Sequence, residues 1–527
     1  MSKSDYRRRQ LRRFKRTLSR HLPTLIALVC IVLVSGGLIF SIYRFVLRRP
    51  APAGTAISAA TPAQAQDSGA GGSAQADAGG SAQADAGGSA QADAGALAQA
   101  GGGTPEHADG GISGEAPGAS SLPQDETDRL IAQADRLALG YDYDGAIALL
   151  NDSGLDASDS RIAAALAGYE EAKGALVPAD VKQTTHVFFH SLIMDTALAF
   201  DGDGDADGYN SVMTTKDEFL KILEELYRRD YVLVRLADVA APAPGADGSL
   251  AFAWGEVLLP PGKKPLVMSQ DDVCYYPYME GDGFANRIVI GADGKPTCEM
   301  TLPDGSVSTG SYDLIPLLED FIGEHPDFSY RGARAVIAFT GYEGILGYRT
   351  SSSYSDSPTY EEDRAQAAAV AQCLRENGWE LASHSWGHLQ LGVSSDSETG
   401  YAISDERFIA DTDRWEAEVE SLIGPTNILI YPYGNDISDW HAYGPENARF
   451  AYLQSKGFQY FCNVDASTPS WMQMGTTYLR MARRNLDGYR LYQDLIQTDP
   501  AKKRLTDLLD AAEVFDPARP TPVGWSY

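Results

Sequence analysis

Residues 264–272 read Lys-Pro-Leu-Val-Met-Ser-Gln-Asp-Asp, an apolar run that is typical of a buried β-strand and ends in two adjacent carboxylates. From about residue 181 onward, similar short runs alternate with amphipathic helical patterns such as 215–231 and 361–378. Strands that alternate with helices in this way indicate a parallel sheet covered by helices. We therefore predict an α/β fold of the (β/α) barrel type for residues 179–527.

Two further predicted strands also end in residues that can carry chemistry. The segment Trp-Glu-Leu-Ala-Ser-His-Ser-Trp-Gly-His (379–388) places His384 and His388 four residues apart, and Asn-Ile-Leu-Ile-Tyr-Pro-Tyr-Gly (427–434) ends in a tight turn. In parallel barrels the carboxyl ends of the strands meet at one face, where active sites form. One aspartate and two imidazoles are ligands that suit zinc or another divalent transition metal and leave coordination positions open. The turn can aim a backbone N–H at a developing oxyanion.

The order of these motifs resembles the polysaccharide deacetylase family, carbohydrate esterase family four. That family has an Asp-Asp motif, then His-[Ser/Thr]-x-x-His, then Pro-Tyr-Gly, and this chain has them at 271–272, 384–388 and 432–434. Phe-Phe-His-Ser-Leu (188–192) resembles the strand that opens the Tyr-His branch of the family. The resemblance covers roughly residues 182–495 and implies a deformed (β/α) barrel of the polysaccharide deacetylase type.

The resemblance implies a role for each matching residue. The implied catalytic residues are Asp271 as general base, His190 as general acid, Tyr433 as oxyanion donor through its N–H, and Arg483 as partner of the base. The implied metal ligands are Asp272, His384 and His388, with zinc as the usual ion. The implied substrate-binding residues are Pro432, Trp386 and Asp465. The usual late-motif histidine is missing, because no histidine follows His441. The resemblance to the Tyr-His branch implies that a histidine on the opening strand supplies the acid, and His190 is the matching residue.

The chain also departs from the family pattern. Gln270 stands where the family has Phe, Val273 replaces the Gly after the Asp pair, and the Arg that usually precedes Pro-Tyr-Gly is absent. All three metal ligands are present, so we expect these departures to affect substrate specificity more than metal binding.

The first 124 residues predict an anchor and a tether. Residues 1–50 hold twelve Lys or Arg and one acid, and the apolar stretch 22–43 is long enough to cross a bilayer as a helix. We predict a basic cytoplasmic segment at 1–20 and an uncleaved transmembrane helix at 21–47, with the N-terminus in the cytoplasm because nine of the basic residues precede the apolar stretch. Residues 48–124, with three copies of Gly-Gly-Ser-Ala-Gln-Ala-Asp-Ala, predict a disordered tether.

Residues 125–178 show apolar residues at helical spacing and predict a small helical region like one tetratricopeptide hairpin. We favour a brace on the following domain over a partner-binding module. The run Asp-Gly-Asp-Gly-Asp-Ala-Asp-Gly (201–208) lacks the glutamate of a calcium loop, so an acidic surface loop is favoured. Four cysteines outside the anchor allow three disulfide pairings, and the sequence leaves them open: Cys274, Cys298, Cys373 and Cys462.

Together with the resemblance, these observations favour a membrane-anchored, extracytoplasmic, metal-dependent deacetylase. We expect it to remove N-acetyl groups from amino sugars of a cell-envelope polysaccharide, either peptidoglycan or poly-N-acetylglucosamine. Beyond residue 50 the chain holds 31 basic and 71 acidic residues, which disfavours nucleic acid as a partner. Two alternatives stay open: an esterase that removes O-acetyl groups, and a non-catalytic carbohydrate-binding envelope protein. The sequence does not indicate any protein partner.

Overall fold

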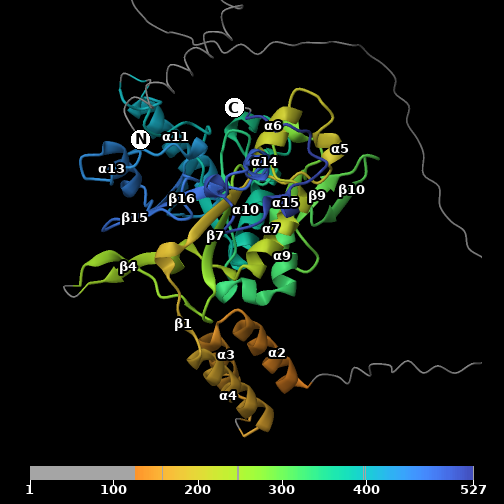
Figure 1. Ribbon diagram of the computed structural model, residues 1–527, viewed down its shortest axis with the longest axis vertical. Coiled ribbons are helices and arrows are strands. Elements are labelled where there is room, and N and C mark those ends of the chain that lie inside the picture. Colours follow the sequence, from red (N-terminus) through yellow and green to blue (C-terminus); the bar gives the residue numbers. More distant parts are fainter. Residues whose placement is uncertain (1–124, 157, 246–247, 396, 398, 526–527) are drawn as a thin grey trace, which may run out of the picture. The chain divides into compact units, whose positions relative to one another are not determined.

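The computed structural model describes residues 125–527, apart from 157, 246–247, 396, 398 and 526–527 (Figure 1). The predicted basic segment at 1–20, anchor at 21–47 and tether at 48–124 lie outside the described residues. Among the residues that the structure describes, no helix combines the length and the apolar composition needed to cross a bilayer.

Seven parallel strands form a closed barrel. Their order is β7, β11, β12, β13, β14, β16 and β2, and β7 pairs with both β2 and β11, which closes the ring. The strands are β2 (Thr185–Phe189), β7 (Lys264–Gln270), β11 (Val336–Phe339), β12 (Glu380–Ser383), β13 (Ile428–Ile430), β14 (Tyr460–Val464) and β16 (Leu479–Asn485). The predicted α/β barrel is confirmed.

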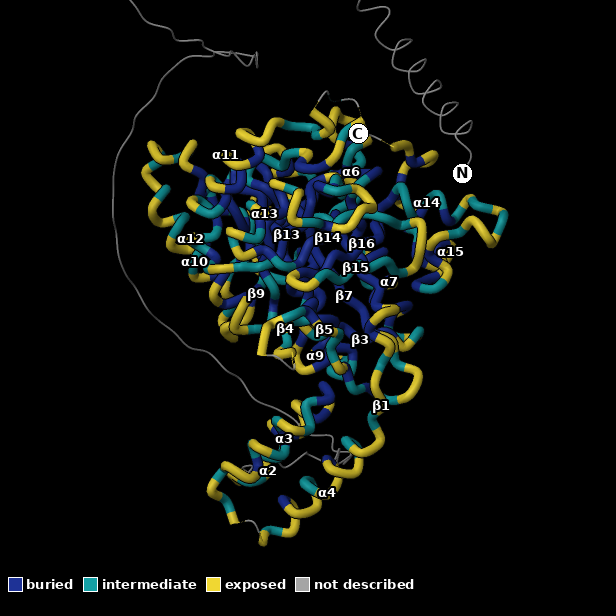
Figure 2. Tube along the Cα trace, turned by 90° about the vertical axis from the view of Figure 1, so that its left-hand side faces the viewer, coloured by how far each residue is buried: buried dark blue, intermediate teal, exposed yellow. Residues whose placement is uncertain are grey.

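The register of the barrel brings several strand ends to one edge. Phe189 of β2 pairs with Gln270 of β7, Phe339 of β11 pairs with Ser383 of β12, and Ser383 also pairs with Leu429 of β13. The segments that follow these strands therefore leave the barrel at the same face. These strands are buried on both sides, as Figure 2 shows for the centre of the molecule.

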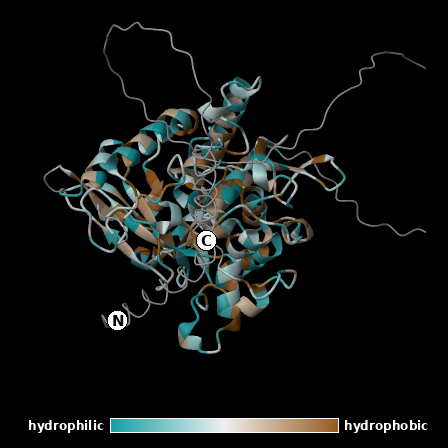
Figure 3. Ribbon diagram, turned by 90° about the horizontal axis from the view of Figure 1, so that it is seen from above, coloured by the Kyte–Doolittle hydropathy of each residue, from teal (hydrophilic) through white to brown (hydrophobic). Residues whose placement is uncertain are grey.

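Helices cover the outside of the barrel. The main ones are α7 (Lys216–Arg228), α9 (Leu314–Glu324), α10 (Tyr360–Glu376), α11 (Asp405–Trp415), α13 (Ala448–Ser455) and α14 (Gly488–Ile496). In α7 a capping box of Thr215 and Glu218 satisfies the first N–H groups. On its inner face Phe219, Ile222, Leu223 and Leu226 are fully buried, while Leu220 is half-buried. Hydrophobic residues gather on the strands and on one side of the helices (Figure 3).

Shorter elements branch from the barrel. Residues 287–310 form an antiparallel sheet of β8 (Arg287–Ile290), β9 (Pro296–Thr301) and β10 (Val307–Gly310). The other strands are β1 (Val177–Pro178), β3 (Tyr231–Leu233), β4 (Ala240–Pro244), β5 (Leu250–Trp254), β6 (Leu258–Leu259) and β15 (Met472–Met474). The short helices are α5 (Thr196–Ala199), α6 (Ala206–Val212), α8 (Leu236–Val239), α12 (Ser421–Ile423) and α15 (Ala511–Val514).

The region before the barrel is a group of three helices, α2 (Glu126–Leu139), α3 (Tyr143–Asn151) and α4 (Ser160–Gly174). Their shared core is built on small and aliphatic side chains, including Ala134, Ala146, Leu150 and Ile162. The Tyr141 hydroxyl donates to the carbonyl of Asp327, 2.9 Å away, so the turn between α2 and α3 contacts the barrel domain directly. These contacts agree with a brace.

The cysteines whose pairing the sequence leaves open are all buried and unpaired in the described residues. They lie in different surroundings. The Cys274 thiol contacts Thr340, for example, and burial, the largest influence, raises its pKa to about 12. A thiol with so high a pKa is a poor nucleophile, so we assign Cys274 a packing role.

Candidate active site

The structure brings the three sequence motifs together at the carboxyl ends of β7, β12 and β13. One ligand atom each of Asp272, His384 and His388 lies within 4.8 Å of the other two. The Nε2 atom of His388 is 3.6 Å from the carboxylate of Asp272. We call these three residues the metal triad, because a carboxylate and two imidazoles at this separation can converge on one ion.

The backbone at the triad is strained. Asp272, His388 and Tyr433 have positive φ angles of 57°, 51° and 58°, a region that side chains other than glycine rarely adopt. Each such residue costs about 1–3 kcal/mol and persists only where the surroundings impose it. Gly434 follows with φ 65°, and a Cβ there would lie 2.4 Å from Cβ of Val464. The tight turn of the Pro-Tyr-Gly motif therefore requires glycine at this position.

Neighbouring groups orient the triad for a cation. The carbonyl of Ile430 accepts from Nδ1 of His384 at 2.9 Å, which leaves Nε2 as the atom that can bind an ion. Burial lowers the pKa of His384 to about 4, so the imidazole is neutral at pH 7. The Tyr276 hydroxyl donates to Asp272 at 2.9 Å. Burial opposes ionisation of Asp272, but the neighbouring His388 and His384 hold its pKa below the usual value. A neutral imidazole next to an ionised carboxylate fits a divalent metal.

Asp271 lies beside the triad in a different setting. Nη1 of Arg483 donates to its carboxylate at 2.6 Å, and both side chains are almost fully buried. Nη1 of Arg483 also donates to the Ser269 hydroxyl at 3.2 Å. Burial opposes ionisation of Asp271, but the Arg483 guanidinium, followed by the nearby His384, outweighs burial and holds the pKa of Asp271 at about 2. Asp271 is therefore ionised throughout the physiological pH range and can accept a proton.

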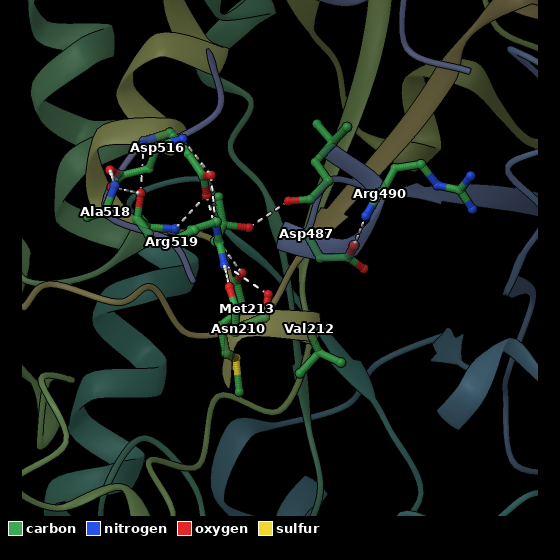
Figure 4. Close-up of polar contacts among 12 residues, drawn as sticks. Asn210, Val212, Met213, Asp487, Arg490, Asp516, Ala518 and Arg519 are labelled. Carbon is green, nitrogen blue, oxygen red and sulfur yellow. Dashed lines mark hydrogen bonds and ion pairs between the residues drawn. The ribbon is translucent and has the colours of Figure 1, made fainter. Parts of the chain in front are cut away.

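His190 lies on the same face, just after β2. The carbonyl of Val212 lies 3.2 Å from its Nδ1, so we assign the Nδ1 proton to that hydrogen bond and leave Nε2 for the cavity. A buried arginine holds this stretch of chain. Arg519 donates to the carbonyls of Asn210 and Met213 at 2.9 and 2.7 Å (Figure 4). Arg519 also forms a two-point ion pair with Glu218.

Two cavities open around these residues. The first, the triad cavity, measures about 280 Å³ and is lined by Asp271, His384, Arg483, Asp487, Arg490 and Trp525 among others. The second, the tyrosine cavity, measures about 480 Å³ and is lined by Asp272, Tyr276, Tyr278, Tyr342, Asp205 and Asp207 among others. Both are also lined by His190, Val212, His388 and Tyr433. A larger cavity of about 620 Å³ between α7 and α9 contains none of the motif residues.

The residues predicted to bind substrate lie around the site but line neither cavity. The indole of Trp386 donates to Glu418 at 3.0 Å and lies under Arg414, 3.4 Å from the ring centre. Pro432 is buried in the turn that carries Tyr433. The carboxylate of Asp465 accepts from the N–H of Ser467 at 2.8 Å and forms a local turn. The predicted catalytic residues His190, Asp271, Tyr433 and Arg483 do line the triad cavity.

Several contacts at the site were missed from the sequence. Asp411 of α11 accepts from the N–H groups of Trp386 and Gly387 at 2.9 and 2.7 Å, and so holds the loop between the two histidine ligands. Asp313 accepts from the side chain of Gln270 and the N–H of Leu192, both at 2.9 Å, and so links the segment after β2 to the end of β7. No local motif marks either aspartate. Gln270, by contrast, stood out as a departure from the family pattern, and Asp313 gives it a polar partner.

A second acidic group lies in the loop 201–208. Carboxylates of Asp203, Asp205 and Asp282 lie within 4.8 Å of one another, and Asp203 and Asp205 are exposed. Exposed acidic groups at this separation are common without a bound ion, and the acidic surface loop stays our interpretation.

Comparisons with known proteins do not add to this geometry. No protein-family model matches the chain, and no curated protein matches it.

Proposed function

We propose that the chain is a metal-dependent hydrolase that removes N-acetyl groups from amino sugars of a cell-envelope polysaccharide. The observation that carries the proposal is the convergence of Asp272, His384 and His388 beside the buried Asp271–Arg483 pair. Hydrolysis of an amide needs a base for water and an acid for the leaving nitrogen. Asp271 and His190 line one cavity with His384 and His388, two residues of the metal triad, and supply both. The barrel and the order of its motifs agree with the polysaccharide deacetylase resemblance.

The donor set fits zinc or another divalent transition metal, which would polarise an amide carbonyl and lower the pKa of water when bound. Asp271 takes the proton from the attacking water as the oxygen–carbon bond forms. The backbone N–H of Tyr433 stabilises the oxyanion. His190, in its doubly protonated form, donates from Nε2 to the nitrogen as the carbon–nitrogen bond breaks. The products are acetate and a free amino sugar.

The predicted anchor and tether place this chemistry outside the membrane. A transmembrane helix at 21–47 followed by about 75 residues of tether gives the barrel reach into an envelope polymer. An enzyme fixed at the membrane in this way meets peptidoglycan or a surface poly-N-acetylglucosamine directly. We therefore propose these polymers as the substrate class.

The test is acetate release by the full-length chain from peptidoglycan and from N-acetylglucosamine oligomers, with and without zinc. We expect zinc-dependent release by the wild type and none by Asp272→Ala. Asp217→Asn, an exposed aspartate on α7, is the matched control and should release acetate at the wild-type rate. Equal release by Asp272→Ala, or release only from O-acetylated glycans, would contradict the proposal.

A further inference from the structure

The tyrosine cavity has a wall of stacked aromatic rings. Tyr276 stacks on Tyr278, with ring centres 5.5 Å apart and planes within 10°, and on Tyr342 at 5.4 Å and 20°. Tyr278 is the outer ring of this stack and is 53% exposed. An aromatic face that is open to a cavity attracts cations as well as the apolar faces of ligands.

The two cavities also differ in the charged side chains that line them. None of the described residues that line the tyrosine cavity is Lys or Arg, whereas Arg483 and Arg490 line the triad cavity. Asp205 and Asp207, from the loop at the start of α6, line the tyrosine cavity from a different part of the chain than the tyrosines. An open tyrosine ring and two carboxylates in one cavity favour a ligand that carries positive charge on a partly apolar body.

We propose that the tyrosine cavity binds an already deacetylated hexosamine unit, as its ammonium form, next to the acetylated unit at the metal triad. This inference rests on the proposed function. Asp272, His190, His388 and Tyr433 line this cavity, so a sugar there would be a direct neighbour of the reacting unit in the polymer. The product of one turnover is the same cation. After one turnover this product becomes the ligand of the tyrosine cavity. The enzyme therefore removes acetyl groups from consecutive units of the polymer.

The test is a titration of glucosamine tetramer into the full-length chain, compared with the fully N-acetylated tetramer and with tetralysine. All proteins carry Asp271→Asn, so that the acetylated ligand is not consumed, and calcium is left out so that it does not neutralise the carboxylates. We expect the glucosamine tetramer to bind about tenfold more tightly than the acetylated one. Asp205→Asn with Asp207→Asn should abolish that difference, and Tyr278→Ala should weaken binding of both sugars. The matched control is Asp201→Asn in the same loop, which does not line the cavity and should keep the difference.

Equal affinity for both sugars would overturn the inference. Equally tight binding of tetralysine and the glucosamine tetramer would also overturn the inference, because the cavity would then attract any ligand with several positive charges. Acetate release by the chain without Asp271→Asn, measured in parallel, separates the two proposals. If acetate is released but the glucosamine tetramer does not bind more tightly than the acetylated one, only this inference is contradicted. If no acetate is released, the proposed hydrolase function is contradicted.

Discussion

His190 is the residue on which the proposed cleavage of an amide depends most. An amine leaves poorly unless it is protonated, whereas the alkoxide of an ester leaves more readily, so the need for an acid differs between the two substrates. The hydrogen bond between Nδ1 of His190 and the carbonyl of Val212 leaves Nε2 as the atom that can donate a proton, and His190 lines the triad cavity. No other imidazole outside the metal triad lines either cavity among the described residues.

We therefore predict that His190→Gln lowers kcat for an N-acetylated oligomer by about 10²- to 10⁴-fold. Turnover of an O-acetylated sugar should fall much less, and zinc content should not change. The measurement is the kcat of both substrates and the bound zinc for wild type and variant. Equal losses on both substrates would assign His190 a structural role and not that of the acid.

At the scale of elements, the C-terminal segment holds the start of α7 through buried charges. The side chains of Arg519 and Glu218 are fully buried and 2.6 Å apart, and Arg519 also holds the backbone on both sides of Val212. Removing one member of a buried ion pair leaves an uncompensated charge, which costs about 3–5 kcal/mol. The segment after Asp510 is therefore an integral part of the barrel domain.

We predict that Arg519→Met destabilises the chain by about 3–5 kcal/mol. Arg519→Met combined with Glu218→Gln should recover part of the loss, because no charge is then buried alone. Urea unfolding of the two variants and the wild type measures both values. A double variant that is less stable than Arg519→Met would show that the ion pair is not the source of the effect.

Another element contact makes stability depend on pH. Glu380, at the start of β12, accepts from the N–H of Leu236 at the start of α8, and burial raises its pKa to about 7 from 4.5. Because the pKa is raised in the folded state, the folded protein binds this proton more tightly than the unfolded chain does. The stabilisation is full below about pH 4.5 and is lost as the pH rises through 7.

Glu380→Gln should therefore be more stable than the wild type by up to about 3 kcal/mol at pH 8.5 and equally stable at pH 4.5. Glutamine keeps an acceptor for the N–H of Leu236 and has no charge to bury. Unfolding free energies at the two pH values test this. A constant difference between wild type and variant at both pH values would exclude titration of Glu380 as the cause.

At the scale of the whole molecule, the features that depend on local sequence patterns could be predicted from the sequence. Asp271, His384 and Tyr433 follow the carboxyl ends of parallel strands, which lie at one face of a closed barrel. The position of these three residues could therefore be predicted from the sequence. Contacts between residues that lie far apart in the sequence could not be predicted. Asp411 is more than twenty residues from the loop it holds, and Trp386, predicted to bind substrate, packs against Arg414 and Glu418 because α11 passes beside its loop.

The barrel and the metal triad have different sources of stability. Hydrophobic residues of the strands and helices form the core, whereas the triad lies on the segments that follow the strands. The chain should therefore fold without zinc, and zinc should stabilise the folded form by binding to it. At a hundredfold excess of free zinc over Kd the gain is about 2.7 kcal/mol.

We predict that zinc raises the Tm of the full-length chain, that a chelator reverses the rise, and that Asp272→Ala abolishes it. Asp282→Asn is the matched control, since Asp282 belongs to the other acidic group of the described residues and its loss should leave the rise intact. Calorimetric scans of the three proteins with and without zinc provide the measurement. If the rise in Tm persisted in Asp272→Ala and vanished in Asp282→Asn, zinc would bind at the acidic loop and not at the metal triad.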